Sequence, residues 1–111
     1  MFEIFLREKT GLQRIVLHNS LTNECVEIIP DLGGTVYKIA LNRNGILHDV
    51  LASDGEELLR ENPLYRGRIL FPFHDCIPYG IYQFRGKYFE LIINCAEDGS
   101  AIHGLLYDKD W

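Results

Sequence analysis

The side chains best suited to acid–base chemistry lie in the last third of this 111-residue chain. His74, Asp75 and Cys76 follow one another after the apolar segment 69–73, and His103 lies in the apolar segment 101–106. Histidine and carboxylate groups act as general acids and bases because their pKa values can be set near neutral pH. Histidine, cysteine and aspartate are also metal ligands. Two separate segments are therefore candidates for a functional site.

The spacing of these residues argues against several of these chemistries. His74, Asp75, Cys76 and His103 fit no zinc pattern such as CxxC or HExxH, so we expect neither a metal nor another cofactor. A nucleophilic Cys76–His74 pair lacks an evident third group to orient it. Local sequence alone favours His103 as a histidine hydrogen-bonded inside a β core. The segment 74–76 can equally be a polar loop with a buried thiol.

The elements that must position these residues are predicted to be short β-strands separated by turn residues. The candidate strands are 2–6, 14–18, 25–29, 35–42, 46–51, 82–84 and 89–93. Asn44-Gly45 is a strong hairpin signal, because a type I′ turn needs positive φ at both central residues. One short helix is predicted over Ser53–Asn62, with Ser53 or Asp54 as N-cap and Pro63 ending it. The pattern indicates an all-β fold, an antiparallel sandwich or barrel.

Three motifs in the last third, taken together, carry a family resemblance. Pro72-Phe73 precedes the polar residues 74–76, the segment 80–87 reads Gly-Ile-Tyr-Gln-Phe-Arg-Gly-Lys, and His103-Gly104-Leu follows. This combination resembles the N-terminal part of the aldose 1-epimerase (galactose mutarotase) family. That family has a Pro-Phe-x-Asn-Arg-Ile segment, a Gly-x-Tyr-x-Phe-x-Gly-Lys hairpin and a His-Gly-Leu or His-Gly-Phe element.

The resemblance implies an antiparallel β-sandwich of the galactose mutarotase type, with residues 1–111 as its N-terminal part, apparently truncated. It implies an isomerase of carbohydrate metabolism that interconverts the α and β anomers of an aldose such as galactose or glucose. His103 would be catalytic, binding the sugar and assisting proton transfer at the ring oxygen. The family's second histidine and its glutamate lie beyond the part resembled, so the isolated chain is expected to be inactive. Exposed strand edges would favour self-association.

The chain departs from the family pattern at two positions. Asp75 replaces asparagine, and Cys76 replaces an arginine that holds sugar hydroxyls and whose guanidinium cysteine cannot imitate. Asp75 can still accept hydrogen bonds from hydroxyls, and His74 can supply a donor. Tyr79 is the aromatic residue most suited to line a cleft. The expected substrate-binding residues are His74, Asp75, Cys76, Tyr79 and His103. Two alternatives stay open: a non-catalytic carbohydrate-binding relative, and a small β interaction domain.

The amino-acid composition limits the kinds of partner that this chain is expected to bind. Acidic residues outnumber basic ones, 16 to 11, and the formal net charge is −5. Because nucleic-acid-binding surfaces are basic, this balance argues against a nucleic acid partner. No apolar run spans a bilayer and no signal peptide opens the chain, which predicts a cytoplasmic protein without a membrane partner. Three cysteines without a CxxC pattern argue against a disulfide framework.

Overall fold

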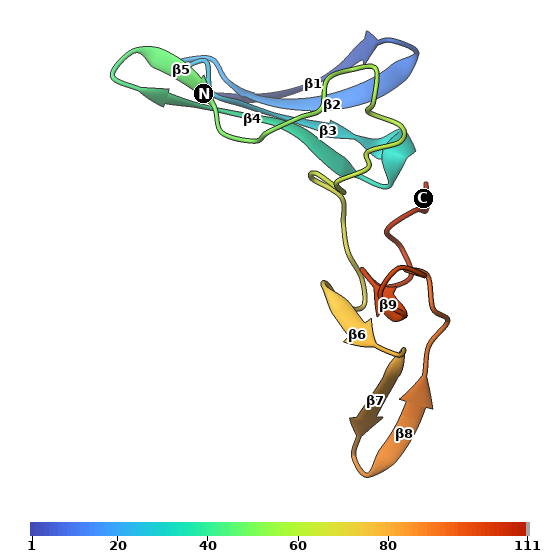
Figure 1. Ribbon diagram of the computed structural model, residues 1–111. Helices are drawn as coiled ribbons and strands as arrows, with labels where there is room; N and C mark the ends of the chain where they lie inside the picture. The colour runs from blue at the N-terminus through green and yellow to red at the C-terminus, as the bar shows by residue number, and fades with distance from the viewer. Residues whose placement is uncertain (111) are drawn as a thin grey trace. The chain divides into compact units, whose positions relative to one another are not determined.

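A computed structural model describes residues 1–110 of the chain (Figure 1). The chain is almost entirely β, and every strand pair is antiparallel, as the sequence predicted. Two compact units divide it. Unit 1 is Met1–Ile69 with Lys109 and Asp110, and unit 2 is Leu70–Asp108. Among the described residues, no helix is long and apolar enough to cross a membrane.

Unit 1 is a five-stranded meander in which each strand pairs with the next along the chain (Figure 1). Its strands are β1 (Phe2–Lys9), β2 (Leu12–Asn19), β3 (Cys25–Ile29), β4 (Thr35–Arg43) and β5 (Ile46–Asp49). A short 3₁₀ helix, η1 (Pro30–Leu32), links β3 to β4. The Asn44-Gly45 turn joins β4 to β5 with φ of 56° and 83°, which confirms the predicted hairpin.

The two faces of this sheet differ in character because side chains alternate along each strand. One face, here called the charged face, includes Arg7 on β1, Arg14 on β2 and Glu27 on β3. The opposite face, here called the apolar face, carries residues from all five strands: Phe2, Ile4, Leu6, Ile15, Leu17, Val26, Ile28, Ile39, Leu41 and Ile46. Phe2, Ile4 and Leu6 are 82%, 71% and 64% exposed, so this face is not buried within unit 1.

Residues 50–68, here called the covering loop, lie against the charged face. Leu59 joins Leu12, Ile29 and Leu32 in a small hydrophobic core, against which Tyr37 packs. The predicted helix over Ser53–Asn62 is wrong, since this segment forms only bends and turns. Both carboxylate oxygens of Asp54 accept from Nε of Arg66 at 3.0 Å, and Asn62 exchanges hydrogen bonds with the Arg66 backbone. Asp54, one of the two expected N-caps, is therefore held by Arg66 instead of capping a helix.

Unit 2 contains two short strand pairs. β6 (Cys76–Pro78) pairs with β9 (Ser100–Ile102), and β7 (Ile81–Phe84) pairs with β8 (Lys87–Glu90). The β7–β8 hairpin was predicted, although its second strand ends at Glu90 rather than at Ile93. β6 was not predicted, because Cys76 was assigned to a polar loop. The rings of Tyr82 and Phe89 stack across the hairpin at 5.2 Å between centroids.

Candidate functional site

The β6–β9 pairing brings together two of the residues that the sequence singled out. Cys76 lies opposite Ile102, and the backbone N–H of His103 donates to the carbonyl of Asp75 at 2.9 Å. Asp75 and His103 are thus opposite each other at one end of the strand pair, although 28 positions separate them in the sequence. A carboxylate and an imidazole on neighbouring backbones are a combination suited to proton transfer and to binding hydroxyl groups.

The backbone after His103 is held closely against the Pro-Phe segment. Phe71 and Gly104 form a parallel bridge, and the Leu105 N–H donates to the Phe71 carbonyl at 2.7 Å. A Cβ added at Gly104 would collide with the Phe71 carbonyl. Glycine is therefore required here for a close approach of two chains as well as for its φ of 78°. This contact ties the two candidate segments together at a second point.

Asp75 and His103 share an uncommon backbone conformation. Their φ angles are 65° and 59°, in the left-handed region that side chains other than glycine adopt at an energetic cost. Such residues persist only where the surrounding structure holds them, and they cluster at functional sites. Seven other non-glycine residues among residues 1–110 also have positive φ, so this conformation supports a site here only together with the pairing of Asp75 and His103.

Asn94 also positions the histidine, and the sequence did not reveal it. Its side-chain amide donates to the Ile102 carbonyl at 2.9 Å, and its Oδ1 accepts from the Ile102 N–H at 2.6 Å. The Asn94 side chain thus forms with Ile102, the residue before His103, the two hydrogen bonds that a neighbouring strand would otherwise form. No local pattern distinguishes this asparagine from one in an ordinary turn.

The other sequence-predicted residues lie on exposed backbone nearby. His74 and Cys76 are exposed on either side of Asp75, so the thiol of Cys76 is not the buried one that the structural alternative required. Tyr79 lies in the turn after β6, with φ of 57° and 75% of its surface exposed. An apolar groove of about 350 Å³ within unit 2 is lined by other residues: Pro72, Phe73, Ile77, Tyr82, Leu91 and Leu105. The structure brings the backbones of Asp75 and His103 together, but none of the five expected site residues lines this groove.

A second polar cluster, in unit 1, was missed. Arg14 is 1% exposed and pairs with Glu27 at 3.2 Å and with Glu56 of the covering loop, and its guanidinium lies 4.5 Å from the centre of the Tyr37 ring. Burial alone would raise the pKa of Glu56, but hydrogen bonds from Lys9, Arg14 and Tyr37 lower it to about 2. The sequence feature that could have revealed this cluster is Arg14 itself, because strand alternation places it on the same face of β2 as Leu12 and Val16.

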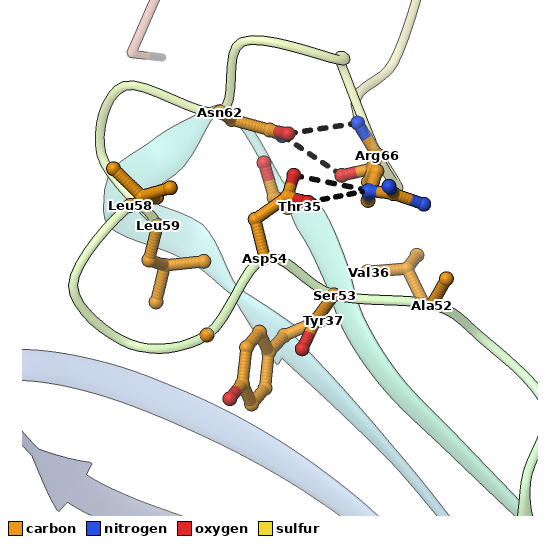
Figure 2. A pocket seen from close by; sticks show the side chains of 11 residues that line it. Thr35, Val36, Tyr37, Ala52, Ser53, Asp54, Leu58, Leu59, Asn62 and Arg66 are labelled. Carbon is orange, nitrogen blue, oxygen red and sulfur yellow. Dashed lines mark hydrogen bonds and ion pairs between the residues drawn. The ribbon is translucent and has the colours of Figure 1, made fainter.

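Beside this cluster, the covering loop encloses a small pocket against β4 (Figure 2). Figure 2 shows Asp54 and Asn62 both pointing toward Arg66, with Leu58 and Leu59 on the opposite side. The interactions of Arg66 are internal to the covering loop. The volume of the pocket, about 20 Å³, is close to what one or two water molecules need. We therefore assign this pocket to fixing the loop. Within residues 1–110, His, Cys, Asp and Glu side chains form no group of three that could hold a metal ion.

Comparison with known proteins places this geometry in context. No protein-family model matches the chain. An uncharacterised protein, YihR, from Escherichia coli (strain K12) is 40% identical over 52 residues, which are 46% of this chain and 17% of that protein. The crystal structure of galactose 1-epimerase from Lactobacillus acidophilus NCFM superposes with a TM-score of 0.69 at 19% identity. That superposition covers 100% of this chain and 33% of the epimerase chain.

These comparisons define the class of fold. The chain has an antiparallel β architecture of the galactose mutarotase type, which confirms the fold predicted from the sequence. It spans one third of the length of the epimerase and less than a fifth of the length of the bacterial relative. At 19% identity, the likeness to the epimerase shows the fold alone.

Proposed function

We propose that the chain is the N-terminal part of an aldose 1-epimerase-like, galactose mutarotase-type domain, and that unit 2 contributes to a monosaccharide site in which His103 binds the sugar and assists proton transfer. The observation that carries this proposal is the pairing of Asp75 with His103 across the end of β6 and β9. The fold likeness to a galactose 1-epimerase supports the substrate class. Tyr79, His74 and Cys76 would surround the sugar on the same exposed backbone.

Mutarotation needs a base for the anomeric hydroxyl and an acid for the ring oxygen. In this proposal His103 serves at the ring oxygen, and Asp75 accepts hydrogen bonds from sugar hydroxyls. The second acid–base group comes from parts of the domain outside these 111 residues. The isolated chain should therefore bind an aldose weakly without accelerating its anomerisation.

A non-catalytic carbohydrate-binding role is the second candidate, and one observation favours it. Cys76 stands where the resembled family has an arginine, and Arg85, in the β7–β8 turn, is the only arginine of residues 70–108. Sugar hydroxyls at Cys76 would thus lack a fixed charged donor. A complete domain that binds the sugar but does not accelerate its anomerisation would favour this second candidate.

The decisive experiment is a titration of the ¹⁵N-labelled chain with galactose and with glucose, followed by amide chemical shifts. The proposal expects saturable shifts centred on Asp75, Cys76 and His103, at millimolar affinity or weaker. His103→Ala should abolish them, whereas His48→Ala, at an exposed histidine of β5, should leave them unchanged. Absence of sugar-dependent shifts in the folded chain would contradict a sugar site in unit 2.

Polarimetry of freshly dissolved α-anomer tests the catalytic part. We expect the chain to follow the buffer rate. A rate well above buffer that His103→Ala removes would show that these 111 residues suffice for catalysis and would overturn the assignment of the second acid–base group to another part of the domain.

A further inference from the structure

A polar cavity on the charged face of unit 1 takes no part in the proposed sugar site. Its volume is about 160 Å³, roughly ten times what one water molecule needs. Six of its lining residues are charged: Arg7, Lys9, Arg14, Glu27, Lys38 and Asp49. Four of these six are cations, so the cavity is dominated by hydrogen-bond donors.

Arg14 is the most buried member of this set, at 1% exposed, and Glu27 follows at 7%. Its Nη1 donates to Glu27 and its Nη2 to Glu56, while Nε is buried and donates no hydrogen bond to any of residues 1–110. Buried donors almost always have an acceptor. The guanidinium is also fixed in orientation by Tyr37. A rigid, buried donor that lines a cavity is a feature expected of a binding site for an acceptor group.

Two further cations of the cavity are only loosely paired. Nη1 of Arg7 lies 3.7 Å from Glu27, and Nζ of Lys38 lies 3.9 Å from Asp49. Both separations exceed ordinary hydrogen-bond lengths, so their N–H groups can turn to another acceptor. Lys9, by contrast, is hydrogen-bonded to Glu56 at 2.8 Å. Arg7 and Lys38 are therefore the cations that can turn toward a ligand, and the Nε of Arg14 is a buried donor beside them without an acceptor among residues 1–110.

We propose that this cavity binds a phosphate group, either as the free ion or as a phosphate monoester. Four cations and two carboxylates line the cavity. Glu56, which pairs with Arg14 and Lys9, adds a third carboxylate, so one positive charge remains without a negative counterpart. A phosphate carries about −1.5 to −2 charges at neutral pH and presents several acceptor oxygens to the donors. A neutral hydroxyl compound would satisfy the donors without offsetting the charge. Asp49 is the carboxylate that opposes binding, because Glu27 already pairs with two arginines.

The test is a titration of the ¹⁵N-labelled full chain with inorganic phosphate at constant ionic strength, which keeps charge screening unchanged. Saturable shifts should centre on the backbone of Arg7, Arg14 and Lys38. Arg7→Gln and Lys38→Gln should each weaken binding about three- to tenfold, since each removes one partly exposed ionic contact. Asp49→Asn should tighten binding. Arg43→Gln, at an exposed β4 arginine outside the cavity, is the matched control and should change nothing.

Two comparisons identify the source of the phosphate. Glycerol 3-phosphate that binds more tightly than inorganic phosphate would assign the cavity to phosphorylated compounds, and equal or weaker binding would assign it to the free ion. Glycerol itself should not bind. The proposal is overturned if the folded chain shows no saturable response to phosphate, if Asp49→Asn weakens binding, or if Arg43→Gln weakens it as much as Arg7→Gln does.

Discussion

At the scale of single residues, the structure separates two kinds of polar side chain. Asp75 and His103 lie on exposed or half-buried backbone in left-handed conformations, where a ligand can reach them. Arg14 and Glu56 are paired between the sheet and the covering loop. The first pair is a candidate for chemistry. The second fixes the covering loop on β2, and its contribution to folding should depend on pH.

Glu56→Gln should remove an acid-sensitive part of the stability. The pKa of Glu56 is about 2 in the folded chain, below the value of an ordinary glutamate. A carboxylate with a lowered pKa stabilises the fold above its unfolded pKa of about 4.3 and loses this effect as the pH falls toward 2. After allowing for solvent screening, we expect a difference of roughly 1–2 kcal/mol between pH 5 and pH 2. Urea unfolding across that range should show a shallower acid dependence for Glu56→Gln than for the parent, with exposed Glu57→Gln as control.

Asp75→Asn with Cys76→Arg should strengthen sugar binding if the loop contacts the sugar. Cys76 is exposed on β6, so an arginine there can extend into solvent without disturbing a core. The change adds a charged donor fork and removes a carboxylate that can mis-pair with hydroxyls. One charge-assisted hydrogen bond is worth about 1.5–3 kcal/mol, or roughly ten- to hundredfold in affinity. Calorimetry with galactose and glucose should be done in a chain that includes the rest of the domain. A folded double mutant with unchanged affinity would show that residues 74–76 do not contact the sugar and have only a structural role.

At the scale of elements, the close contact between Gly104 and Phe71 determines where His103 is held. Gly104→Ala should destabilise unit 2, because it combines positive φ with a collision against the Phe71 carbonyl. Gly99→Ala is the matched control: its φ of 69° imposes the same backbone strain, but an added Cβ meets nothing within 4 Å. We expect Gly104→Ala to cost roughly 1–3 kcal/mol more than Gly99→Ala. Hydrogen exchange at the Leu105 amide, which bonds to Phe71, measures this directly. Equal protection in both variants would argue against the contact.

The elements also show what the sequence could predict. Strand alternation and the Asn44-Gly45 signal located seven of the nine strands and the β4–β5 hairpin, because these depend on local pattern. The helix over Ser53–Asn62 failed because Asp54, one of the two expected N-caps, binds Arg66 instead of capping. β6 and β9 were missed because each has only three residues and is defined by its partner. The juxtaposition of Asp75 with His103 follows from that pairing, so local pattern could name both residues but not bring them together.

At the scale of the whole molecule, the apolar face of the β1–β5 sheet predicts self-association. Apolar residues from five strands lie on it, and exposed patches of this kind normally mark contact surfaces. Ile4→Lys places a charge within this face, on a side chain that is already 71% exposed, so it should disrupt association without unfolding the chain. Leu21→Lys is the control, because Leu21 is 81% exposed in the β2–β3 turn, outside the face, and the charge change is identical. Light scattering after size exclusion should show the parent and Leu21→Lys as oligomers at concentrations where Ile4→Lys is a monomer. A monomeric, cooperatively folding parent chain would show that the apolar face does not drive association.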